Sequence, residues 1–156
     1  MHNIGIAHMD LKLENIMIDT LSKKLKIIDF GESRVFHDTL NSHTFILEKG
    51  VHGSIPYIAP EEFTGIEYNP EKADVWSVII ILYEILYSTL PWQIANITNY
   101  KYKKFNTLFK IDKQLSPSIF HKQNCKFTEL FKHGLNPDPN LRCNIEYIKN
   151  NIQLQT

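Results

Sequence analysis

The sequence HMDLKLEN occupies residues 8–15, and DFG follows at residues 29–31 after a short, largely apolar stretch. Together they supply an acid, an ammonium group, a carboxamide and a second acid, carried by Asp10, Lys12, Asn15 and Asp29. Transfer of a phosphoryl group needs such side chains, because the protein aligns an acceptor hydroxyl and neutralises charge on the phosphates. The two segments therefore indicate phosphoryl-transfer chemistry.

The chemistry of each group suggests its role. Asp10 is the candidate base that receives or orients the acceptor hydroxyl. Lys12, two residues on, projects to the same side and can stabilise the transferring phosphoryl group. Asn15 offers a neutral oxygen and Asp29 an anionic one to Mg²⁺, which prefers hard oxygen ligands and keeps several waters. Lys12, Asn15 and Asp29 are thus the candidates for holding a nucleotide, and Asn15 and Asp29 for holding its metal ion.

The pattern resembles the eukaryotic protein kinases, whose catalytic loop reads H-R-D-L-x-x-x-N and whose metal-binding loop reads D-F-G. Residues 53–61, GSIPYIAPE, resemble the kinase segment that ends in A-P-E. Residues 74–77, DVWS, resemble the start of the central kinase helix, and residues 135–142, LNPDPNLR, resemble a late segment of the family. One short match arises by chance, but these occur in the family's order and cover nearly the whole chain.

This resemblance implies roles for residues far from the opening motif. Asp74 would hold the backbone of the catalytic loop, and Arg142 would pair with Glu61. His8 would brace the loop through hydrogen bonds rather than act in catalysis. Met9 stands where the family usually has an Arg that grips a phosphorylated loop residue, which puts phosphorylation of that loop in doubt as the main switch. Ile79 replaces a helix residue that is often Gly.

The resemblance also implies an enzyme class and its ligands. ATP and Mg²⁺ are the expected cofactors, and a protein is the expected substrate. Lys12, together with Gly53 and Ser54 before Tyr57, resembles serine/threonine kinases more than tyrosine kinases. The sequences EEF at residues 61–63 and LPWQIA at residues 90–95 resemble fungal kinases that control nutrient permeases and ion transport.

The expected fold is mainly α, a kinase-like C-terminal lobe with a short β-ribbon at the catalytic and metal-binding loops. Runs of β-branched residues at 16–19 and 25–28 predict the ribbon, which would carry Asn15 and Asp29 at its two open ends. A cap residue, a proline and a continuous apolar run predict a buried central helix over residues 69–86, with Pro91 ending it. Further helices are expected at residues 96–109, 127–135 and 144–152.

Length and motif content suggest that residues 1–156 are a single, partial kinase domain. The sequence contains no Gly-rich phosphate loop and no strand Lys, so we expect the β-rich N-terminal lobe to be absent and the polypeptide as written to have little activity. The central helix would then lack cover from a preceding helix and expose apolar surface, unless the missing lobe or a partner chain covers it. Two alternatives stay open, a kinase-like binding or scaffold module and a nonfunctional gene remnant.

Composition excludes several other classes. With 17 basic and 17 acidic residues the net charge is zero, which gives no footprint for nucleic acid or an anionic membrane. The longest apolar stretch, residues 75–83, is too short to span a membrane. Cys125 and Cys143 are too few for a disulfide scaffold, and the histidines show no zinc-ligand spacing. The N-terminus resembles no export signal, so we expect a cytoplasmic location and reduced thiols.

Overall fold

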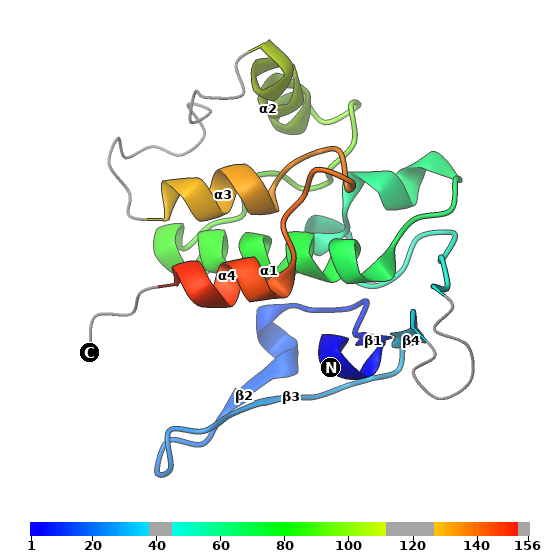
Figure 1. Ribbon diagram of the computed structural model, residues 1–156. Coiled ribbons are helices and arrows are strands. Elements are labelled where there is room, and N and C mark those ends of the chain that lie inside the picture. The colour runs from blue at the N-terminus through cyan, green and yellow to red at the C-terminus, as the bar shows by residue number, and fades with distance from the viewer. Residues whose placement is uncertain (38–44, 112–126, 153–156) are drawn as a thin grey trace.

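The computed structural model describes residues 1–37, 45–111 and 127–152. A helical body gathers around α1 (Pro70–Tyr87), and the segments near the N-terminus lie along one side of it (Figure 1). A ribbon of β2 (Ile16–Ile18) and β3 (Leu25–Ile27) projects away from the helices. The architecture is mainly helical, with small two-stranded sheets.

The helix α1 lies at the centre of this body, as its apolar sequence predicts. Asn69 caps the first turn by accepting a hydrogen bond from the Glu71 amide at 2.9 Å. Pro70 takes the first helical position, where a missing amide costs nothing. The Trp76 side chain is fully buried. Apolar residues on nearly every face of α1 therefore place it in the interior.

The end of α1 is set by Ser88 rather than by Pro91. Ser88 adopts the left-handed conformation with φ 54°, and its amide donates to the Glu84 carbonyl at 2.8 Å. This bond satisfies one of the last helical carbonyls and turns the chain away from the helix axis. The helix therefore ends at Tyr87, before the chain reaches the proline.

Shorter helices cover α1. Two of them, α3 (Thr128–Gly134) and α4 (Ile145–Asn151), lie within their predicted ranges. The helix α2 (Tyr100–Ile111) begins and ends later than predicted. Its start is displaced because Asn96 and Asn99 use their side chains to bind the amides of Thr98 and Tyr102 at 3.1 and 3.2 Å, which favours turns over helix at residues 96–99. None of the helices in the described ranges is long and apolar enough to cross a membrane.

The ribbon forms as predicted and brings its two ends together. β2 and β3 pair antiparallel, with Ile16 opposite Ile27. These two side chains pack against the core and attach the ribbon to the helical body. The Ile28 amide then donates to the Asn15 carbonyl at 2.9 Å, which holds the residues just outside the ribbon side by side. A second short antiparallel pair, β1 (Ile6–Ala7) with β4 (Arg34–Val35), directly precedes residues 8–15 in the chain.

The predicted apolar surface on α1 is present toward its C-terminal end. Ile85 is 61% exposed and Leu86 is 39% exposed. Near the middle of the helix, a hollow of about 300 Å³ opens beside Val78, between residues 1–3 and α4. Of the two cysteines, Cys143 is a free thiol, and Cys125 lies outside the described residues.

Candidate active site

Asp74 of α1 holds the backbone of the loop that carries Asp10. Asp74 is only 1% exposed, and its two carboxylate oxygens accept the His8 amide at 2.7 Å and the Met9 amide at 2.8 Å. Charge-assisted bonds of this kind are about twice as strong as neutral ones. The role implied for Asp74 is confirmed, and the first turn of the loop is fixed to the most buried helix.

His8 braces the loop, as expected. Its ring is fully buried, with Nε2 3.0 Å from the Ile28 carbonyl oxygen and Nδ1 3.3 Å from the Asp10 amide nitrogen. A carbonyl can only accept and an amide can only donate, so Nε2 carries the proton. His8 thereby connects the catalytic loop to the segment that leads into Asp29.

Met9 is a core residue in this structure. It is 6% exposed and adopts a positive φ of 66°. The position that usually carries a phosphate-gripping Arg in the family is thus occupied by a buried apolar side chain.

Asp10 and Lys12 lie together, as the sequence predicts. The Lys12 ammonium is 2.7 Å from Asp10 Oδ2. Burial raises the pKa of Asp10, but the Lys12 ammonium, with a smaller contribution from Ser54, outweighs it and leaves the pKa below its usual value. The hydrogen bond to Asp10 raises the pKa of Lys12. At neutral pH the pair is therefore a carboxylate beside an ammonium ion.

One oxygen of Asp10 is unpartnered. Asp10 Oδ1 is buried and has no hydrogen-bond partner in the described part of the chain. A lowered pKa makes this carboxylate a weak proton acceptor but a good partner for a neutral hydroxyl. The arrangement is suited to orienting an incoming hydroxyl group.

Ser54, which in the sequence indicated only the type of kinase, joins this pair. The Lys12 ammonium donates to Ser54 Oγ at 2.8 Å across 42 residues of sequence. Gly53 makes the approach possible. It has φ +80°, and a Cβ at this position would overlap the Met9 carbonyl oxygen. Apart from the Gly-Ser pair, no local signal in the sequence pointed to this contact.

Asn15 and Asp29 lie at the open end of the ribbon. The Asn15 amide nitrogen donates to the Asp10 carbonyl at 2.9 Å, which leaves its side-chain oxygen without a partner among the described residues. Asp29 is exposed, with φ 60°, and its carboxylate accepts only a long 3.4 Å bond from the Gly31 amide within those residues. These two oxygen donors fit Mg²⁺, which typically binds one or two carboxylates and completes its shell with phosphates and water.

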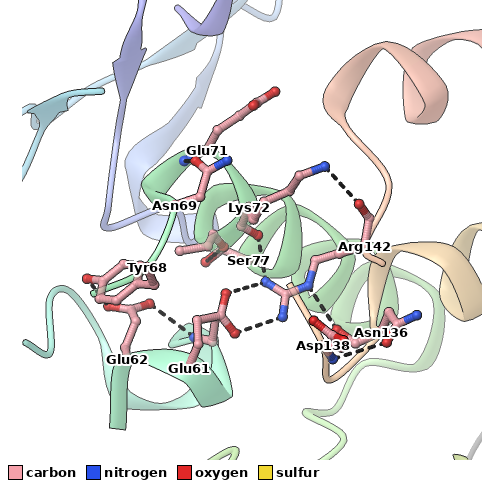
Figure 2. A network of polar contacts seen from close by, with 12 residues as sticks. Glu61, Glu62, Tyr68, Asn69, Glu71, Lys72, Ser77, Asn136, Asp138 and Arg142 are labelled. Atoms are coloured by element: carbon pink, nitrogen blue, oxygen red, sulfur yellow. Dashed lines mark hydrogen bonds and ion pairs between the residues drawn. The ribbon is translucent and has the colours of Figure 1, made fainter. Parts of the chain in front are cut away.

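Arg142 and Glu61 form a buried ion pair beside the first turn of α1 (Figure 2). Arg142 donates through both terminal nitrogens to Glu61, at 2.6 and 2.8 Å. It also donates to the carbonyl oxygens of Lys72 at 2.7 Å and Asn136 at 3.0 Å. The pairing implied by the resemblance is confirmed. It joins the APE segment, α1 and the loop before α4.

The structure combines an Asp that binds the backbone of an H-x-D loop, an Asn and a DFG acid at the ends of one ribbon, and a buried Glu–Arg pair. These are the features of a protein-kinase-like fold. Comparison with known families agrees, because the model of the protein kinase domain matches residues 1–152. The chain belongs to the protein kinase family.

Its relatives include serine/threonine kinases. The chain is 35% identical to serine/threonine-protein kinase ppk8 of Schizosaccharomyces pombe over 99% of its own length and 30% of the relative. It is 43% identical to serine/threonine-protein kinase PRR2 of Saccharomyces cerevisiae, over 67% of its length and 15% of the relative. The nitrogen permease reactivator protein of the same yeast is 37% identical over 67% of the chain and 13% of the relative. The chain thus spans less than a third of each of these relatives, and the predicted likeness to fungal kinases is confirmed.

Proposed function

We propose that this chain carries the phosphoryl-transfer centre of a serine/threonine protein kinase, which moves the γ-phosphate of ATP to a Ser or Thr hydroxyl of a protein substrate. The Asp10 carboxylate, which pairs with the Lys12 ammonium and has one oxygen without a hydrogen-bond partner among the described residues, is the observation that carries the proposal. The substrate hydroxyl would donate its hydrogen bond to this carboxylate. Lys12 would then lie close to the charge that develops on the transferring group.

The nucleotide and its metal ion would occupy the open end of the ribbon. Asn15 and Asp29 would hold Mg²⁺, which supplies neutralising charge to the phosphates when it is bound. Met17 follows Asn15 closely on β2 and is 55% exposed, so it offers an apolar surface for the base of ATP.

We further propose that residues 1–156 form one partial kinase domain, located in the cytoplasm, that transfers phosphate only slowly as an isolated polypeptide. Orientation of reactants can supply about 7 to 11 kcal/mol of barrier reduction. Much of that orientation depends on a Gly-rich loop and a strand Lys, neither of which occurs in this sequence. A protein segment that covers Ile85 and Leu86 would be part of the active assembly.

Manganese relaxation measurements test the nucleotide site even if binding is weak. Mn²⁺ accepts the same oxygen ligands as Mg²⁺ and broadens nearby NMR signals. With Mn²⁺ and ATP, we expect broadening of the amide signals of Asn15 and Asp29. Asp29→Asn should abolish it. Asp19→Asn, which changes an exposed acid in the turn of the same ribbon, should leave it intact.

The opposite outcome would favour the binding or scaffold alternative. If Mn²⁺ with ATP broadens the same signals in Asp29→Asn as in the original chain, or broadens none near Asn15, then Asn15 and Asp29 do not hold the nucleotide.

A further inference from the structure

The carboxylate of Glu62 lies where several segments of the chain meet. It belongs to η4 (Pro60–Thr64) and is 3% exposed. One oxygen accepts the Ala59 amide at 3.1 Å. The other accepts the His52 amide at 3.2 Å and the Tyr68 hydroxyl at 3.2 Å. Figure 2 shows Glu62 beside Tyr68, on the opposite side of Glu61 from Arg142. Such a buried acid needs its donors, because an unpaired one would be costly.

The bond to His52 leads directly to the proposed catalytic pair. His52 precedes Gly53, and a Cβ on Gly53 would lie 3.1 Å from the Asp10 Cα. Ser54 comes next and accepts the hydrogen bond from the Lys12 ammonium at 2.8 Å. The position of the His52 amide therefore determines how Gly53 and Ser54 lie against the catalytic loop.

The bond to Tyr68 secures the earlier part of the same segment. The backbones of Tyr68 and Glu48 exchange two hydrogen bonds, at 2.8 and 2.9 Å. The Glu48 carboxylate also pairs with Arg34 Nε at 3.0 Å. Through Tyr68 and His52, one buried side chain is thus connected to both parts of residues 45–54.

We propose that Glu62 is a positioning residue for the phosphoryl-transfer site. Its carboxylate fixes His52, and through Gly53 and Ser54 it keeps the Lys12 ammonium beside Asp10. The inference rests on the proposed function, because Asp10 and Lys12 are the groups which that function uses. Glu62 itself touches neither of them through a hydrogen bond.

This positioning depends on protonation. Burial raises the pKa of Glu62 to about 7, against the hydrogen bonds from His52 and Ala59 that favour the charged form. Protonation turns one acceptor oxygen into a donor that faces other donors, which weakens the hold on His52. The titratable groups that act on Glu62 are Glu61 and Tyr68, and the titratable groups that line the same small pocket are His52, Asp10, Tyr57 and Asp74. The site should therefore loosen as Glu62 takes up a proton.

An NMR titration of the chain tests this inference. We expect the amide signals of Gly53 and Ser54 to shift with pH, and the midpoint of that shift to equal the midpoint at which the Glu62 carboxyl carbon signal titrates. In Glu62→Gln that titration should disappear, and the Lys12 ammonium protons should exchange roughly tenfold faster, as expected for one lost hydrogen bond. Glu67→Gln, an exposed neighbour, should behave like the original chain. His52→Asn keeps the amide donor and removes the ring, so it should leave the Gly53 midpoint in place.

A second variant keeps the test valid if Glu62→Gln does not fold. Tyr68→Phe removes a donor to the charged carboxylate, so the Glu62 midpoint should rise and the Gly53 and Ser54 midpoints should rise with it. If the titration midpoints of the Gly53 and Ser54 signals are the same in both variants as in the original chain, the positioning role is wrong. Failure of the manganese experiment alone would overturn the proposed function and leave this coupling intact.

Discussion

The helical body and the ribbon end of the molecule hold their charged groups in opposite ways. In the body, Glu61 and Arg142 are 7% and 2% exposed and bind each other through two hydrogen bonds. At the ribbon, Asp29 is exposed and accepts a single long bond among the described residues. Charged groups that maintain the fold have their hydrogen-bonding capacity used within the protein. Those assigned to chemistry leave positions open for a ligand.

The strongest test of this difference removes half of the buried pair. Arg142→Met leaves the Glu61 carboxylate buried without its partner, so we expect a loss of about 3 to 5 kcal/mol in the free energy of unfolding. Urea denaturation measures it. Lys132→Met, which breaks the pair with the 63% exposed Glu129, should cost no more than about 1 kcal/mol.

The double variant Glu61→Gln with Arg142→Met sharpens the same point. It removes the isolated charge and should recover part of the lost stability. Equal losses in the Arg142 and Lys132 variants would contradict the contrast between the two regions.

Glu62 should make the stability of the body depend on pH. Burial favours the neutral acid of Glu62 over its carboxylate and raises its pKa from 4.5 to about 7 in the folded chain. The neutral acid therefore stabilises the fold fully below about pH 4.5, and this stabilisation is lost as the pH rises through 7, even though protonation weakens the local bond to His52. The change is on the order of 3 kcal/mol, since one pKa unit corresponds to about 1.4 kcal/mol. Urea unfolding at pH 5 and pH 8 measures it. Glu62→Gln should remove this pH dependence and Glu67→Gln should preserve it; a profile unaltered by Glu62→Gln would count against the assignment.

The contact between Gly134 and Ile79 should produce an intermediate effect. A Cβ at Gly134 of α3 would overlap Ile79 Cγ1 on α1 and lie 2.8 Å from its Cδ1. Gly134→Ala in a helix would ordinarily stabilise, but here we expect a loss of about 1 to 3 kcal/mol. Chemical denaturation of both single variants and of Ile79→Ala with Gly134→Ala gives the coupling. Additive losses would show that the two positions are not size-matched.

The smallest effect on stability is expected at the ribbon. Asp29→Asn should change the free energy of unfolding by less than about 0.5 kcal/mol, because the side chain is exposed and weakly bonded. Thermal or urea unfolding checks this. A large loss would mean that Asp29 supports the fold, as Asp74 does, and would remove the distinction between the two regions.

Much of the fold could be predicted because it follows from local signals. The proline after Asn69 and the continuous apolar run predicted α1, and two short β-branched runs predicted the ribbon. The order of motifs along the chain predicted the bonds from Asp74 to the loop and from Arg142 to Glu61. The start of α2 was placed too early, because the turn chemistry of Asn96 and Asn99 outweighed the helical pattern.

Residue types and their spacing were enough to predict the family, the side chains proposed for phosphoryl transfer, and the helices and ribbon that carry them. Three contacts could be found only in the folded chain: Lys12 donates to Ser54, Gly134 accommodates Ile79, and Glu62 bridges His52 and Tyr68. Each of these contacts joins residues whose side chains or backbones approach one another only after the chain has folded. The hydrogen bonds of Glu62 are strengthened by burial, and the fit of Gly134 against Ile79 depends on close packing; no spacing in the sequence records either effect.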